Sequence, residues 1–111
     1  MSDLSQKHCK PCKGDDKPLS KEQVNVLLND ISQWKSNEQS SQITRTFKFK
    51  NYYETIAFVN AIAWISHQED HHPDLQVEYN KCTVNYSTHT VKGLSENDFI
   101  CAAKINNLVP E

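Results

Sequence analysis

The stretch 67-HQEDHHPD-74 ends the longest apolar segment of the chain and determines where its helix stops. Pro73 has no N–H to donate, and it pushes His72 out of the helical region toward an extended backbone. Because the backbone period changes between His71 and His72, the two rings point in different directions. An imidazole has an ordinary pKa of ~6.5, so both protonation states are available near neutrality. We predict that one ring faces a pocket as a proton carrier, while the other contacts a substrate or supports its neighbour.

A second histidine motif, 87-STH-89, follows two segments that alternate apolar and polar residues, 75–79 and 82–88. Such alternation is typical of strands. The tight link at Asn80-Lys81 predicts an antiparallel hairpin. Four of the five histidines fall in the two motifs, and the hairpin would bring His89 back toward His72. We therefore expect these histidines to share one site.

Length and composition bound the class of protein. The chain has 111 residues, enough for one domain. Its 12 basic and 14 acidic residues give a net charge of -2, which argues against direct binding of nucleic acid. No apolar run approaches the ~20 residues of a membrane span, and the polar N-terminus does not resemble a signal peptide. Four cysteines without an export signal indicate reduced thiols and a cytoplasmic location.

Residues 1–18 form a polar N-terminal segment that carries the motif 8-HCKPC-12. A CxxC pair suggests a zinc or redox site. Zinc usually takes four ligands, and no second spaced pair follows; nor does the motif link a strand to a helix, as a thioredoxin motif would. We interpret this segment as a flexible arm with two free thiols that catalysis does not need. Residues 19–111 are then expected to form a single domain.

The remaining elements have clear start signals. Ser20 with Gln23 predicts a capped helix with an apolar stripe. An extended piece begins at Trp34, and 43–49 alternates as a strand. Asn51 starts a helix that runs over 52–69, and Ser95 with Asp98 starts a last helix that ends near 107. The helix 52–69 is apolar nearly all round, which predicts burial by the sheet on one side and by another element or subunit on the other.

The order α-β-β-α-β-β-α, with hairpin-like links, predicts an α+β fold. We expect a two-layer sandwich: a four-stranded antiparallel sheet with its helices on one face. The opposite face should be polar, because it carries Thr44, Thr46, Lys48, Thr83, Asn85 and Ser87.

The chain resembles the pterin-4a-carbinolamine dehydratase family, also called 4a-hydroxytetrahydrobiopterin dehydratase, over essentially its whole length. The resemblance rests on His71-His72-Pro73 followed at family spacing by Tyr79, His89 and Asp98. Supporting matches are Trp34, Phe47-Lys-Phe49, Ser87-Thr88-His89 and Gly93-Leu94-Ser95, and the bacterial branch is indicated by Cys9-x-Pro-Cys12 and Pro18-Leu19.

This resemblance implies a hydro-lyase that removes water from a 4a-hydroxytetrahydropterin to give the quinonoid dihydropterin. Such an enzyme recycles the pterin cofactor of an aromatic amino acid hydroxylase and needs no metal or organic cofactor of its own. By resemblance, His71 and His89 are the acid/base pair and His72 holds and orients the pterin. The pocket would also be lined by Pro73, Thr88, Thr90 and Val91. The family also implies dimers or tetramers.

Two acidic residues are expected to support the site. Asp98 would orient His89 and fix its tautomer; the alternative is that it only stabilises the start of its helix. His67 stands where some members carry an acidic residue, so Glu69 or Asp70 would partly substitute for that carboxylate. For Trp34, Phe47, Phe49 and Tyr79 we predict core packing.

Two other functions compete. His67 and His71 at i and i+4 would share a helix face, as zinc ligands do, but Gln68 stands where the zincin motif needs Glu, so we predict no metal site. A non-catalytic pterin-binding or dimerisation module with a regulatory protein partner is the second alternative.

Overall fold

The computed structural model describes residues 4–109. It contains a short 3-10 helix η1 (Leu4–Gln6), helix α1 (Lys21–Leu28) and strands β1 (Lys35–Ser36) and β2 (Ile43–Lys48). Helix α2 (Tyr52–Glu69), strands β3 (Asp74–Glu78) and β4 (Lys81–Tyr86), the 3-10 turn η2 (His89–Val91) and helix α3 (Glu96–Asn106) follow. The predicted order of elements is therefore observed.

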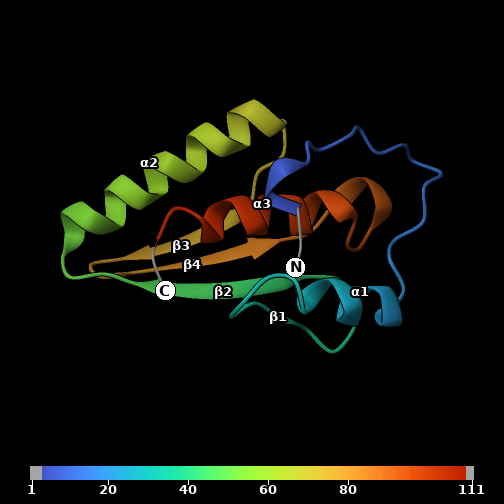
Figure 1. Ribbon diagram of the computed structural model, residues 1–111, viewed down its shortest axis with the longest axis horizontal. Helices are drawn as coiled ribbons and strands as arrows, with labels where there is room; N and C mark the ends of the chain where they lie inside the picture. Colours follow the sequence, from blue (N-terminus) through green and yellow to red (C-terminus); the bar gives the residue numbers. More distant parts are fainter. Residues whose placement is uncertain (1–3, 110–111) are drawn as a thin grey trace.

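The four strands form one antiparallel sheet in the order β1-β2-β4-β3. Figure 1 shows α2 and α3 on the same side of this sheet, with η1 against α3. Val24 of α1 is fully buried in the same core. The α+β sandwich predicted from the sequence is confirmed.

The helices begin where the capping signals predict. Ser20 Oγ accepts from the N–H of Gln23, whose side chain accepts in return from the N–H of Ser20. The side chain of Asn51 accepts from the N–H of Glu54 at the start of α2. At α3 the N–H of Ser95 donates to Asp98 Oδ2. These bonds satisfy backbone donors that a helix leaves unpaired in its first turn.

The two faces of the sheet differ as expected. Alternate residues of the central strand β4 are fully buried under the helices: Cys82, Val84 and Tyr86. On the open face, Thr46 and Thr83 join their hydroxyls across the strands at 2.9 Å. Period-two alternation therefore separates the core from a polar surface.

Helix α2 buries only one of its apolar sides. Phe58 and Ile62 lie in the core, whereas Trp64 remains 61% exposed. The edge strand β3 is also poorly covered, since Val77 is 40% exposed, and Tyr79 directly after the strand is 65% exposed. The prediction that Tyr79 packs in the core is wrong, because it lies in the turn that leaves the edge strand, whereas Trp34, Phe47 and Phe49 do pack in or against the core.

The hairpin turn lies one residue earlier than predicted. Glu78 pairs with Lys81, so Tyr79 and Asn80 form the turn. Its position is fixed by contacts from elsewhere: Thr55 Oγ1 donates to the carbonyl of Tyr79, and the N–H of Phe49 donates to that of Asn80.

The prediction of a flexible N-terminal arm is also wrong. Leu4 is 4% exposed and belongs to the core cluster. The N–H of Cys9 donates to Glu69 at the end of α2, and Lys10 is hydrogen-bonded to Asn97 on α3. Composition suggested a solvated segment, but these long-range contacts dock it beside the two helices.

Candidate functional site

The end of α2 places His71 outside the helix. Asp70 adopts a left-handed conformation with φ 52°, and the N–H of His71 closes the last turn on the carbonyl of Ser66. His67 and His71 therefore do not share a helical face, which removes the basis for the paired metal ligands considered above. His67 instead packs against Trp64, with 5.4 Å between the ring centroids.

The His71 ring is held on two sides. Its Nε2 lies 2.6 Å from Asp98 Oδ1, and its ring stacks on Tyr86 at 5.5 Å between centroids and 13° between planes. Its side chain is 14% exposed, so most of the ring is shielded from solvent. Burial pushes the pKa of His71 down, but the hydrogen bond and charge of Asp98 outweigh burial and raise the pKa above its ordinary value.

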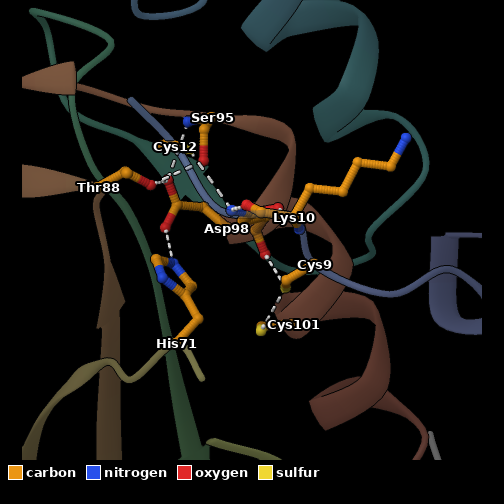
Figure 2. Close-up of polar contacts among 9 residues, drawn as sticks. Cys9, Lys10, Cys12, His71, Thr88, Ser95, Asp98 and Cys101 are labelled. Carbon is orange, nitrogen blue, oxygen red and sulfur yellow. Dashed lines mark hydrogen bonds and ion pairs between the residues drawn. The ribbon is translucent and has the colours of Figure 1, made fainter. Parts of the chain in front are cut away.

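Asp98 is fully buried and uses both carboxylate oxygens (Figure 2). Oδ2 accepts from Thr88 Oγ1 at 2.7 Å and from the N–H of Ser95 at 3.0 Å, while Oδ1 pairs with His71. The prediction that Asp98 orients His89 is wrong: its partner is His71. Sequence spacing does not show which of two nearby histidines lies against the first turn of α3.

His89 lies in a short loop after β4 whose two ends are joined by backbone hydrogen bonds. Backbone bonds between Thr88 and Gly93 close the loop, so the turn His89–Val91 projects from the sheet. A Cβ on Gly93 would lie 2.7 Å from Pro18, so this position requires glycine. The His89 side chain is exposed, and no described residue hydrogen-bonds to its ring.

A pocket of 230 Å³ gathers the predicted histidines. Its lining residues are Asp70, His71, His72, Ser87, Thr88, His89 and Thr90. The structure therefore brings the two histidine motifs together, as the hairpin predicted. Pro73 and Val91, also predicted to line the site, are not among its lining residues, and Val91 is 5% exposed in the interior.

A larger pocket of 550 Å³ lies on the other side of His71 and was missed by sequence reasoning. It is lined by residues 8–12 of the arm, residues 68–71 at the end of α2, Asn97 on α3, and Thr88 and Thr90. The CxxC motif was the available signal, because it marked the arm as more than a polar tail.

Glu69 is a buried carboxylate that sequence reasoning noted only as a nearby acid. It accepts from the N–H of Cys9 at 2.7 Å and contacts His8 Nδ1 at 2.9 Å, with Lys104 Nζ 3.8 Å away. Burial raises the pKa of Glu69, but these partners together lower it below its ordinary value. The charged form of Glu69 thus anchors the arm.

Cys9, Cys12 and Cys101 lie in the same region, and none of the described cysteines forms a disulfide. Cys9 Sγ is 3.5 Å from Cys101 Sγ, and this contact raises the pKa of Cys9 and lowers that of Cys101. Within residues 4–109 no group of three or more potential ligands is arranged to hold a metal ion. In the same range none of the helices has the length and apolar character needed to cross a bilayer.

The family model described as pterin 4 alpha carbinolamine dehydratase matches residues 17–108. A curated relative from Nitrosospira multiformis, named "Putative pterin-4-alpha-carbinolamine dehydratase", is 57% identical over 97% of this chain and 94% of its own. A relative of the same name from Legionella pneumophila is 54% identical over 97% of this chain and 96% of its own length.

Two solved structures are similar. One is described as a transcriptional coactivator/pterin dehydratase from Brucella melitensis; it has a TM-score of 0.79 and 30% identity, over 83% of this chain and 98% of that one. The other is described as a pterin dehydratase-like protein that is a RuBisCO assembly factor in the alpha-carboxysome. It has a TM-score of 0.59 and 22% identity, over 68% of this chain and 87% of that one, and it shows the shared fold alone. With this sheet, these histidines and these matches, the chain belongs to the pterin-4-alpha-carbinolamine dehydratase family, a family of hydro-lyases.

Proposed function

We propose that the protein dehydrates a 4a-hydroxytetrahydropterin to the quinonoid dihydropterin. The observation that carries this proposal is the hydrogen-bonded His71–Asp98 pair, whose histidine lines a pocket that also contains His72 and His89. The reaction breaks the C4a–O bond with protonation of the leaving hydroxyl, and it removes the proton on N5. Imidazoles can perform both proton transfers without a metal or organic cofactor.

His71 is the group best prepared to act as the acid. Asp98 raises its pKa, so His71 keeps its proton to higher pH than an ordinary histidine. With Nε2 bonded to Asp98, the proton for the leaving hydroxyl comes from Nδ1, which no described residue hydrogen-bonds. His89 then accepts the N5 proton, and His72 orients the ring. Asp70 and Thr90, which line both pockets, complete the binding surface.

The product of this reaction is the substrate from which a reductase regenerates the tetrahydropterin. The enzyme would thus recycle the cofactor of an aromatic amino acid hydroxylase. The test is to generate the carbinolamine with such a hydroxylase and to measure its disappearance with and without the protein. Acceleration above the spontaneous rate, unchanged after exhaustive chelation, is expected; loss of activity on chelation with recovery by zinc would contradict the metal-free mechanism.

A regulatory binding module is the second candidate, because the Brucella melitensis structure at 30% identity is described as a transcriptional coactivator as well as a pterin dehydratase. The same assay separates the two. A binding module would show affinity for a reduced pterin without turnover, whereas an enzyme shows both. The net charge of -2 disfavours direct DNA contact, so a regulatory partner would be a protein.

We also propose that the chain self-associates. Trp64 on α2 is 61% exposed, and β3 pairs with β4 alone within the described chain, which leaves its outer edge uncovered. Exposed apolar surface and unpaired strand edges usually mark interfaces. Light scattering at micromolar concentration should find a dimer or tetramer that high salt does not dissociate. Trp64→Glu should lower the mass, and Lys48→Glu on the polar face should not; a wild-type particle at 12.8 kDa would contradict the proposal.

A further inference from the structure

The larger pocket adjoins the histidine pocket. Both are lined by Asp70, His71, Thr88 and Thr90. His71 therefore stands on a common wall, with His72 and His89 on one side and the N-terminal arm on the other. The histidine pocket of 230 Å³ is smaller than the ~300–1,000 Å³ of typical ligand sites, whereas the arm pocket of 550 Å³ lies within that range.

The chemistry of a pterin indicates what the second pocket holds. C6 is bonded directly to N5, so a substituent on C6 begins beside the atoms that react. When C4a and N5 lie against His71, that substituent must extend into an adjoining space. The arm pocket adjoins His71, and its lining is rich in hydrogen-bonding groups, including Lys10, Gln68, Thr90 and Asn97.

The arm is fixed firmly enough to act as a wall. Asn97 Oδ1 accepts from the N–H of Lys10 at 3.0 Å, and Asn97 Nδ2 donates to the carbonyl of Lys10 at 2.7 Å and to Cys12 Sγ at 3.6 Å. Glu69 holds the N–H of Cys9 at 2.7 Å. Figure 2 shows Cys9 and Lys10 beside α3, near the His71–Asp98 pair.

We propose that arm residues 8–12 form the specificity wall of the enzyme and receive a hydroxylated substituent on C6 of the pterin. This inference rests on the proposed dehydratase function and adds to it the segment that contacts the C6 substituent and so determines specificity at that position. Asn97 is a positioning residue in this arrangement, because it acts through the arm backbone.

The test compares carbinolamines that carry a dihydroxypropyl or a methyl group on C6. Asn97→Ala should lower the ratio of their kcat/KM values by about tenfold, the low end of what one pocket contact contributes to discrimination. Asn97→Asp keeps an acceptor for the Lys10 N–H but loses the donor to the Lys10 carbonyl. The ratio of kcat/KM values should therefore fall less in this variant than in Asn97→Ala. An added carboxylate in the first turn of α3 is favourable, so this variant should fold.

Glu96→Ala is the matched control. Glu96 precedes Asn97, and among residues 4–109 its contact with the arm is an exposed ion pair with Lys7, which does not line the pocket. It should leave both kcat/KM values unchanged. A ratio that stays at the wild-type value in both Asn97 variants would overturn the proposal.

Hydrogen exchange provides a readout that does not require turnover. Non-reacting 7,8-dihydrobiopterin should slow exchange of the Lys10 amide more than 7,8-dihydro-6-methylpterin does. Equal protection by the two ligands would overturn the specificity wall. If the protein turns over neither carbinolamine, the dehydratase function fails, and the exchange comparison still decides whether the arm contacts the substituent.

Discussion

His71 and His89, predicted as the acid/base pair, lie in opposite surroundings. His71 is nearly buried, bonded to Asp98 and stacked on Tyr86, whereas the His89 ring is exposed on a projecting turn. A buried ring with a carboxylate partner has its orientation and its proton set before substrate arrives. An exposed ring gains its position only from the substrate or from another subunit. The two histidines are therefore expected to respond differently to the same changes.

The largest effects should come from removing either ring. Both His71→Ala and His89→Ala should lower the dehydration rate by ~10²–10⁴-fold, the usual contribution of a general acid or base. The measurement is the steady-state rate with a generated carbinolamine. Near wild-type turnover in one variant would remove that histidine from the mechanism.

Stability should separate the two variants. His71→Ala leaves the Oδ1 of buried Asp98 without its partner, which should cost about 1–3 kcal/mol. His89→Ala removes an exposed side chain and should stay within about 0.5 kcal/mol of wild type. Urea unfolding measures both. Equal losses would show that the contrast in packing has no energetic consequence.

Asp98→Asn should change the pH dependence through His71. Because Asp98 raises the pKa of His71, removing its charge should lower that pKa and move the alkaline limb of kcat to lower pH. The same linkage acts on stability. The raised pKa stabilises the fold fully below the unfolded pKa of ~6.5, and this contribution is lost as pH rises through the folded value. Asp98→Asn should flatten that dependence, and an unshifted alkaline limb would assign it to another group.

The smallest effect is expected at Tyr86. Its hydroxyl is buried and has no hydrogen-bond partner among the described residues. Tyr86→Phe keeps the ring that stacks on His71, so it should change the unfolding free energy by less than about 1 kcal/mol and leave kcat near wild type. A large loss of activity would mean that the hydroxyl, and not the ring face, supports His71.

Much of this organisation could be predicted because it depends on local signals. The caps at Ser20, Asn51 and Ser95 act within one helical turn, so a few consecutive residues are enough to locate each helix start. Pro73 prevents the helix from continuing through His72 by local sterics. Alternation in 82–88 marks the buried side of β4 whatever its neighbours are. The hairpin then brings His89 into the pocket with His71 and His72.

The rest depended on contacts between residues far apart in the chain. The hairpin turn lies one residue earlier than predicted, where Thr55 and Phe49 donate hydrogen bonds to its two carbonyls. Asp98 pairs with His71, 27 residues earlier, and not with the nearer His89. The polar arm docks because buried Glu69, 60 residues from Cys9, offers it a charged acceptor.

The sequence by itself determined the α+β order of elements, the ends of the helices and the residues that carry the chemistry. Those properties follow from backbone sterics, capping and periodicity, all of which act over a few residues. Only the tertiary structure decided which histidine pairs with Asp98 and that the arm lines a second pocket. Composition and spacing record neither, because burial and pairing depend on which distant groups come within hydrogen-bond distance once the chain has folded.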